Sequence, residues 1–279
     1  MEQFKTKESL RKQIAKWHRD GLSVGLVPTM GALHEGHLSL MRLVLRNSDR
    51  VVVSIFVNPT QFGPNEDFAK YPREESSDLA KCNSVGVHAV FTPTPEEMYG
   101  TSATVSLVES KLSKVMCGVT RPHHFGGVLT VVSKLFNIVQ PDVAVFGQKD
   151  AQQLAIIKRM VRDLDFPIRI IGAPIVREPD GLAKSSRNMY LTNEERGKAL
   201  CLRESLDIAE KAYASGNTDA AAVIGRMRDH IDDVPGTGID YITAVDADSL
   251  EPVTTLRSNT LVAMAVYLGK TRLIDNTIL

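Results

Sequence analysis

Residues 28–37 read Pro-Thr-Met-Gly-Ala-Leu-His-Glu-Gly-His and follow directly on a short apolar run, Leu22 to Val27, that predicts a buried strand. The segment therefore places a turn and two histidines where a strand ends and a helix begins. In an open α/β sheet, backbone N–H groups and the helix dipole at such a junction face an anionic ligand. We expect an anion to bind at this point of the chain.

The two histidines, His34 and His37, are the candidate ligand-binding side chains. They are three residues apart, so one helical turn would put both imidazoles on one face. Gly36 between them has no Cβ, which would let a ligand approach the backbone. Two imidazoles beside a helix N-terminus suit a phosphate whose charge grows during a reaction. Two other interpretations stay open: an ordinary turn with packed histidines, and a zinc site that lacks a third ligand nearby.

The bulk properties indicate a cytoplasmic globular protein. The 279 residues suffice for one large or two moderate domains. Lys plus Arg and Asp plus Glu both number 33, a balance that argues against nucleic acid as partner. Cys82, Cys117 and Cys201 are far apart, which suits a reducing cytosol. The N-terminus lacks the apolar core of a signal peptide, and no run is long enough to span a membrane.

Residues 1–176 predict a Rossmann-like parallel sheet with helices on both faces, because short apolar strands alternate with helical periodicity. The predicted strands cover residues 22–27, 51–57, 88–91, 143–146 and 168–171. The predicted helices carry Leu10, Ile14 and Trp17, then Leu38, Met41 and Leu45, then Leu79, Cys82 and Val85, and finally residues 128–138 and 151–164.

The pattern changes after Val176. Helical periodicity runs through residues 193–232, and two β-rich runs follow at 239–245 and 261–268. We interpret residues 177–279 as a smaller C-terminal α+β domain that serves as a lid. Residues 177–181, which contain a proline and a glycine, form the expected linker.

Polar residues follow two further predicted strands. Asn58 and Gln61 come directly after the second strand, and their amides both donate and accept hydrogen bonds. Lys149 follows the strand at 143–146, beside a new helix N-terminus and within reach of a phosphate. Asp150 is expected to be the N-cap of that helix, and Gln153 lies one turn further on.

Two loops add groups of anion-binding types. Residues 184–188, Lys-Ser-Ser-Arg-Asn, lie at the domain junction and are interpreted either as a solvated charged loop or as a clamp that closes over a nucleotide. Residues 121–127, Arg-Pro-His-His-Phe-Gly-Gly, precede another helix. His123 and His124 are interpreted as packed residues, or as residues that support those in contact with the ligand, rather than as ligands themselves. The two glycines are interpreted as backbone freedom near the start of the helix.

Taken in order, these segments resemble the pantoate–β-alanine ligase family of the nucleotidylyltransferase superfamily. His-Glu-Gly-His at 34–37 matches the superfamily's His-x-Gly-His element and would identify only the superfamily. The resemblance to the ligases also covers residues 28–31, 56–62, 147–153 and 180–188, and it extends nearly from end to end.

The resemblance implies an ATP-dependent ligation in two steps. Pantoate would attack the α-phosphorus of ATP to give pantoyl adenylate and pyrophosphate. β-Alanine would then displace AMP to give pantothenate, a precursor of coenzyme A. Mg²⁺ would bridge phosphate oxygens, and the enzyme would be a homodimer joined through its first domain.

The resemblance also implies roles for individual residues. His37 would be the proton donor, with His34 and Lys149 beside it as catalytic groups. Gln61 and Gln153 would hold pantoate, with Gln61 also near β-alanine. The ATP site would be lined by Met30, Gly31, Ala32, Leu33, His34, Glu35, Gly36, His37, Gly147, Gln148, Lys149, Asp150, Val176, Lys184, Ser185, Ser186 and Arg187. Lys184 departs from the family's Met or Leu and adds a cation beside the phosphates.

Three other functions stay open at this point. A simple nucleotidylyltransferase would release pyrophosphate but no AMP. A metal-dependent hydrolase would use His34, His37, His123 and His124. A nucleotide sensor would turn over none of the substrates.

Overall fold

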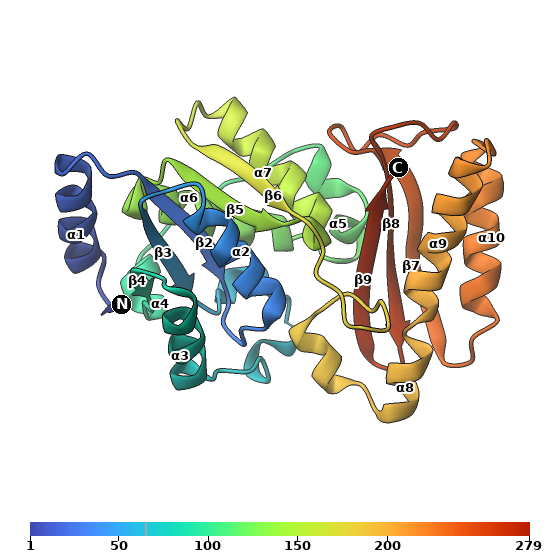
Figure 1. Cartoon of the computed structure of the whole chain (residues 1–279), viewed down its shortest axis with the longest axis horizontal. Helices are drawn as coiled ribbons and strands as arrows, with labels where there is room; N and C mark the ends of the chain where they lie inside the picture. Colours follow the sequence, from blue (N-terminus) through green and yellow to red (C-terminus); the bar gives the residue numbers. More distant parts are fainter. Residues whose placement is uncertain (65) are drawn as a thin grey trace.

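The apolar run before the histidine segment forms β2 (Val24–Thr29), an inner strand of a six-stranded sheet with the order β1-β4-β3-β2-β5-β6 (Figure 1). This computed structural model describes residues 1–64 and 66–279. Every neighbouring pair in the sheet is parallel. The other strands are β1 (Glu2–Phe4), β3 (Arg50–Ile55), β4 (Ala89–Phe91), β5 (Val143–Gly147) and β6 (Arg169–Ala173).

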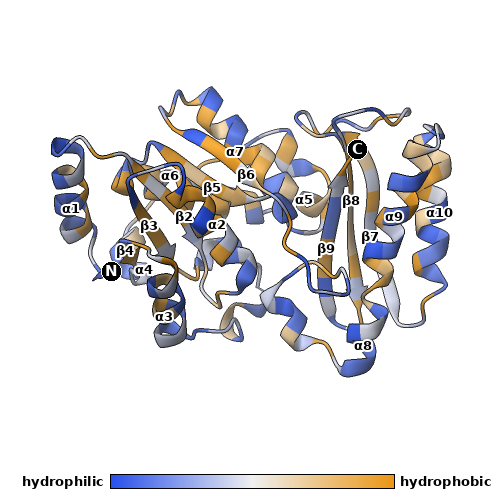
Figure 2. Ribbon diagram, in the orientation of Figure 1, coloured by the Kyte–Doolittle hydropathy of each residue, from blue (hydrophilic) through white to orange (hydrophobic). Residues whose placement is uncertain are grey.

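Helices cover both faces of this sheet, as a parallel sheet requires. On one face, α1 (Lys7–Arg19), α6 (His124–Val139) and α7 (Ala151–Asp163) pack on side chains such as Leu26 and Phe146. On the other face, α2 (Glu35–Leu45) and α3 (Glu75–Val85) pack on the alternate residues of the same strands. Strands such as β3 and β5 are consequently hydrophobic over most of their length, whereas helices such as α1 and α3 carry many hydrophilic residues (Figure 2).

Short elements connect these layers and bring the polar segments to the edge of the sheet. They are α4 (Pro95–Tyr99), α5 (Cys117–Thr120), and the 3₁₀ turns η1 (Pro59–Gln61), η2 (Asp67–Ala69), η3 (Leu112–Lys114), η4 (Gln148–Asp150) and η5 (Ser186–Tyr190).

The C-terminal part has its own antiparallel sheet in the order β7-β8-β9. One face of this sheet packs on α9 and α10, and residues of the other face, such as Leu261 and Ala263, join the core of the first sheet. The central strand is buried on both faces for this reason. The elements are α8 (Asn193–Lys198), α9 (Cys201–Ala214), α10 (Ala220–Asp232), β7 (Thr237–Asp246), β8 (Thr260–Leu268) and β9 (Thr271–Ile278).

The structure confirms the predicted fold class, a parallel sheet with helices on both faces and a smaller α+β part after it. All five predicted strands of the first sheet are present, with ends displaced by a few residues. Two strands were not predicted: β1, which has only three residues, and β9, whose polar residues Asp275 and Asn276 are buried. In the described part of the chain, no helix is both long and apolar enough to cross a bilayer.

Candidate active site

The candidate site lies where β2 and β5 run side by side, because the strand order reverses between them. From β2 the sequence continues through the histidine segment, and from β5 it continues through η4, which carries Lys149. A cavity of about 240 Å³ opens at this edge of the sheet. Its wall includes Met30, His34, Gly36, His37, Gln61, Gly147, Lys149, Asp150, Gln153, Val176, Lys184, Ser185, Ser186 and Arg187.

The two imidazoles are brought together by a reciprocal cap on α2. His34 is the N-cap, with an extended backbone, and its Nδ1 accepts a hydrogen bond of 3.1 Å from the backbone N–H of Gly36. His37 is in the first turn, and its Nδ1 accepts one of 3.2 Å from the backbone N–H of His34. The ring centroids are 4.1 Å apart. The two capping hydrogen bonds therefore hold the rings side by side. His34 precedes the helix, and only His37 lies within it.

This cap determines which ring nitrogen carries the proton. Each Nδ1 is an acceptor, so in the neutral ring the proton must lie on Nε2. Burial, reinforced by the positive charges of Lys149 and Lys184, lowers the pKa of His34 to about 4. Burial, with a smaller contribution from His34, lowers the pKa of His37 to about 3. At neutral pH both residues are therefore uncharged and carry an Nε2–H donor.

The structure corrects the expectation that free N–H groups of this helix face the ligand. The N–H of Gly36 is bonded to the His34 ring, and the N–H groups of His37 and Leu38 are bonded to the carbonyl oxygen of His34. The role of Gly36 also differs from the expectation. A Cβ there would lie 2.8 Å from the His34 ring, so the missing side chain makes room for the imidazole.

A buried carboxylate, which the sequence analysis did not single out, holds the turn before the histidines. Asp78 of α3 accepts hydrogen bonds of 2.8 Å from the backbone N–H groups of both Ala32 and Leu33. Ala32 has a positive φ of 49°, a strained conformation that these bonds help to fix. Burial raises the pKa of Asp78. Only a contact between distant segments identifies this residue, and no local motif does so.

Five of the expected ATP-site residues do not line the cavity. Ala32 and Leu33 are buried against Asp78, and Glu35 is exposed and pairs with Arg42. Gly31 and Gln148 also lie outside the cavity wall, although both belong to the loops that form it.

Lys149 projects from η4 between β5 and α7. It makes no ion pair with any residue that the structure describes. Asp150 occupies the N-cap position of α7, but its side chain makes no capping hydrogen bond. The predicted N-cap position of Asp150 is thus confirmed, but its side chain does not cap the helix. Its exposed carboxylate lies on the cavity wall beside Lys149.

Gln61 is positioned by a network that the Asn-Pro segment builds. The Asn58 side chain donates to Gln61 Oε1 at 3.1 Å and accepts from the Tyr99 hydroxyl at 2.6 Å. Asn58 is thus a support for Gln61. A Cβ on Gly127 would lie 2.4 Å from the carbonyl oxygen of Thr60, so this glycine permits close packing of α6 on η1. That close contact replaces the backbone freedom expected at Gly127.

His124 also supports Gln61. Its Nδ1 lies 2.9 Å from the carbonyl oxygen of Gln61 and must donate to it, since a carbonyl oxygen only accepts. Burial lowers the pKa of His124 to about 4. His123 is exposed.

No group of three or more His, Cys, Asp or Glu side chains that could hold a metal occurs within residues 1–64 and 66–279.

The loop of residues 184–187 also lines the cavity, with Lys184 next to the histidine segment. Its two cations are paired with carboxylates: Arg187 with Asp67 at 3.1 Å, and Lys184 with Glu178 at 3.0 Å. The Ser185 side chain caps η5 by accepting from the N–H of Arg187. The loop therefore presents two cations, each held beside an anion that a phosphate could replace.

The lowered pKa of His37 predicts a pH dependence of stability. Between the unfolded value of 6.5 and the folded value of about 3, the unfolded chain binds the additional proton, so stability falls as the pH falls. The wild type should lose up to about 2 kcal/mol more unfolding free energy than His37→Gln between pH 6.5 and about pH 5. Urea unfolding at a series of pH values measures the difference, and equal slopes would contradict the pKa argument.

Comparison with known proteins identifies the family. The sequence model of the family described as pantoate-beta-alanine ligase matches residues 2–278. The chain belongs to this family. The pantothenate synthetase of Moorella thermoacetica is 53% identical over 279 residues, covering 100% of this chain and 99% of that protein. The enzyme of Enterococcus faecalis is 52% identical over 273 residues, covering 98% and 97%.

Solved structures of pantoate–β-alanine ligases have the same fold. Pantothenate synthetase from Thermus thermophilus matches with a TM-score of 0.95 and 41% identity, covering 100% of this chain and 99% of that chain. The ligase from Francisella tularensis, complexed with beta-gamma ATP and beta-alanine, matches with a TM-score of 0.78 and 32% identity, covering 100% and 97%. The ligation of pantoate and β-alanine is accordingly the reaction of this chain.

Proposed function

We propose that the cavity between β2 and β5 performs this ligation in two steps through pantoyl adenylate. In the first step, a carboxylate oxygen of pantoate attacks the α-phosphorus of ATP and the bond to pyrophosphate breaks. In the second, the amine of β-alanine attacks the acyl carbon, loses a proton, and displaces AMP. The observation that carries this proposal is the convergence of two neutral imidazoles and Lys149 on one cavity wall.

The cationic wall fits the triphosphate. The Nε2–H groups of His34 and His37 donate without being charged, and Lys149 supplies a positive charge beside them. Such fixed donors stabilise the charge that accumulates on the α-phosphate and on the departing pyrophosphate. Arg187 and Lys184 exchange their carboxylate partners for phosphate oxygens. The Francisella tularensis relative, complexed with beta-gamma ATP, supports nucleotide binding by this fold.

The inner part of the cavity fits pantoate. Pantoate has a dimethyl-substituted carbon between two hydroxyl-bearing carbons, so it needs an apolar wall and polar partners together. Side chains of α6 such as Val131 and Leu135 provide the apolar wall, and Gln61 and Gln153 provide the polar partners. Gln61 would also contact β-alanine, as the family resemblance implies.

Asp150 and the phosphate oxygens would hold Mg²⁺. The donor set fits, because the Asp150 carboxylate is exposed on the cavity wall and makes no capping hydrogen bond, and Mg²⁺ prefers carboxylate and phosphate oxygens. The ion would neutralise phosphate charge and favour the departure of pyrophosphate.

Replacing Gln61 tests the pantoate pocket. Gln61→Ala should raise the KM for pantoate roughly 10-fold while the KM for ATP changes little, because the buried Gln61 lines the cavity and is proposed to hold pantoate rather than ATP. Gln61→Glu is the matched variant: it keeps the shape and places a negative charge beside the pantoate carboxylate, so its effect should be larger. An unchanged pantoate KM in both variants would refute the assignment.

The reaction itself is tested by omitting one component at a time. ATP, Mg²⁺, pantoate and β-alanine together should give AMP, pyrophosphate and pantothenate. Without β-alanine, pyrophosphate should appear only in amounts stoichiometric with enzyme. Continued release of pyrophosphate with no AMP would instead indicate a simple nucleotidylyltransferase.

Residues 1–176 and 177–279 are proposed as two domains, the second acting as a lid. The second part has its own core between α9, α10 and the antiparallel sheet, and it supplies the loop at 184–187.

We place the enzyme in the cytoplasm, where ATP is available. Cys82, Cys117 and Cys201 are all buried free thiols, which fits a reducing compartment. Cell fractionation tests the location.

A homodimer through the first domain is proposed from exposed apolar residues. Val105, Val108 and Val119 are 84%, 82% and 70% exposed, and a second copy of the chain would cover them. Sedimentation equilibrium should give twice the chain mass of 30.7 kDa, and a single-chain mass at micromolar concentration would contradict the dimer.

A further inference from the structure

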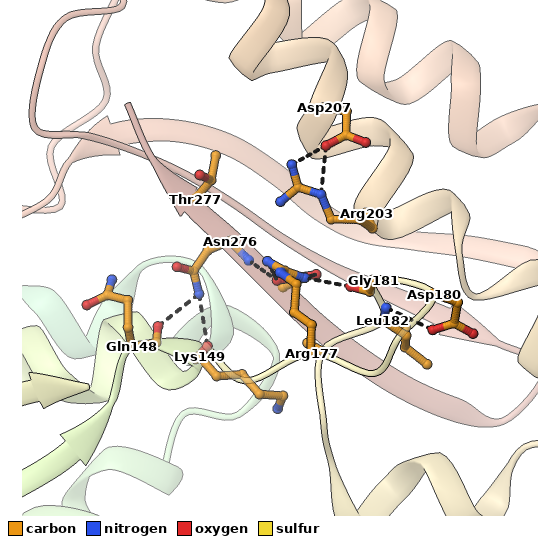
Figure 3. Close-up of polar contacts among 12 residues, drawn as sticks. Gln148, Lys149, Arg177, Asp180, Gly181, Leu182, Arg203, Asp207, Asn276 and Thr277 are labelled. Carbon is orange, nitrogen blue, oxygen red and sulfur yellow. Dashed lines mark hydrogen bonds and ion pairs between the residues drawn. The ribbon is translucent and has the colours of Figure 1, made fainter. Parts of the chain in front are cut away.

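The last strand of the chain reaches the loop that carries Lys149. Asn276 of β9 is buried, and its side-chain Nδ2 donates hydrogen bonds of 3.0 Å to the carbonyl oxygens of both Gln148 and Lys149 (Figure 3). The Lys149 ammonium points away from Asn276, so the contact fixes the backbone of Lys149 and leaves its side chain free.

The orientation of this amide follows from its partners. Both partners are carbonyl oxygens, which only accept, so the NH₂ group must face η4. The Oδ1 atom is buried and has no hydrogen-bond partner among the described residues. An unsatisfied buried oxygen costs stability. The Asn276 side chain therefore donates to both η4 carbonyl oxygens while its own Oδ1 stays unpaired. Because the unpaired oxygen costs stability, this arrangement points to a role of Asn276 at the site rather than in stabilising the fold.

The neighbouring residue anchors β9 on its other face. Asp275 pairs with Arg177 through bonds of 2.7 and 3.0 Å, and it also accepts 2.8 Å from the N–H of Asn276. Arg177 in turn donates to the carbonyl oxygen of Gly181. Successive residues of a strand point to opposite faces. Asn276 thus contacts the η4 loop, and Asp275 contacts Arg177 in the hairpin of residues 177–183, which leads into residues 184–187.

We infer that Asn276 is a positioning residue for adenylation: it holds the η4 backbone so that Lys149 meets the phosphate beside His34 and His37. The inference rests on the proposed role of Lys149. A displacement of about 1 Å of a reacting group is enough to cost roughly 100-fold in rate. Asn276 needs no contact with substrate to have such an effect.

Kinetics of the full-length enzyme test this role. Asn276→Ala removes both donors, and Asn276→Asp keeps the shape but sets a carboxylate oxygen against two carbonyl oxygens. Both should lower kcat for pyrophosphate release by roughly 10- to 100-fold and leave the KM for pantoate within about 2-fold. Thr277→Val is the matched control, because Thr277 bonds to Glu210 of α9 from the same strand. It should change kcat by less than about 2-fold.

A double-mutant cycle separates positioning from general stability. In a Lys149→Met background, Asn276→Ala should lower kcat by less than about 3-fold, because its effect passes through Lys149. Thermal unfolding of every variant shows whether the rates refer to folded protein. The inference is overturned if both Asn276 variants keep wild-type kcat, or if the loss is equally large in both backgrounds. Wild-type kcat in Lys149→Met alone would instead overturn the role of Lys149.

Discussion

Replacing His37 by glutamine is expected to lower the single-turnover rate of pyrophosphate release from ATP and pantoate by roughly 100- to 1,000-fold, the loss typical of one fixed donor to a developing anion. The imidazole offers its Nε2–H to the phosphate because its Nδ1 is occupied by the backbone N–H of His34. Glutamine at this position can still accept that N–H, since Glu or Gln three residues after an N-cap completes the same cap. It cannot place a donor where Nε2 lies.

A comparison with His37→Ala separates chemistry from folding. Alanine removes the donor and also the cap, so it should lose activity as glutamine does and lose about 1 kcal/mol of unfolding free energy as well. Pyrophosphate release is measured by rapid quench and stability by urea unfolding. If His37→Gln released pyrophosphate at the wild-type rate, His37 would be only a structural cap.

Replacing Lys149 by methionine is expected to have an effect of similar size, roughly 100-fold or more on kcat for pyrophosphate release, together with a raised KM for ATP. Lys149, the proposed catalytic cation, has no ion-pair partner among the described residues, so its whole charge would act on the phosphate. Methionine keeps most of the side-chain length and removes only the charge.

Lys158→Met is the control for Lys149→Met. Lys158 is an exposed residue of α7, the helix that follows η4, so its replacement removes the same charge away from the cavity. The control variant should keep wild-type kinetics. Equal behaviour of the two variants would mean that Lys149 acts only through the overall charge of the enzyme.

The first sheet was predictable because its strands are short, rich in β-branched residues and covered on both faces. Arg50–Ile55 and Val143–Gly147 show this pattern clearly. β9 was not predictable in the same way. Its buried Asp275 and Asn276 interrupt the apolar pattern, and they are buried because of contacts with Arg177 and η4, which are remote in sequence.

Most of the residues predicted for the site line the cavity, but the hydrogen bonds among them were not predictable from the sequence. The spacing of His34 and His37 and their place after a strand indicated a phosphate site. The strand–helix junction predicted that helix N–H groups would face the ligand. The imidazoles of His37 and His34 instead accept from the N–H groups of His34 and Gly36, which leaves the Nε2–H groups as donors for the ligand. Asp78 and Asn276 carried no local signal, because each acts on a loop far away in the sequence.

The central claim is that His34 and His37 are neutral at pH 7 and direct Nε2–H at the nucleotide. Nitrogen-15 NMR of the histidine side chains tests it directly, with His34→Gln and His37→Gln used to assign the signals. Both rings should be neutral with the proton on Nε2, and α,β-methylene-ATP should shift both Nε2 signals while the exposed His18 stays unchanged. A proton on Nδ1, a charged ring at pH 7, or no response to the nucleotide would contradict the account.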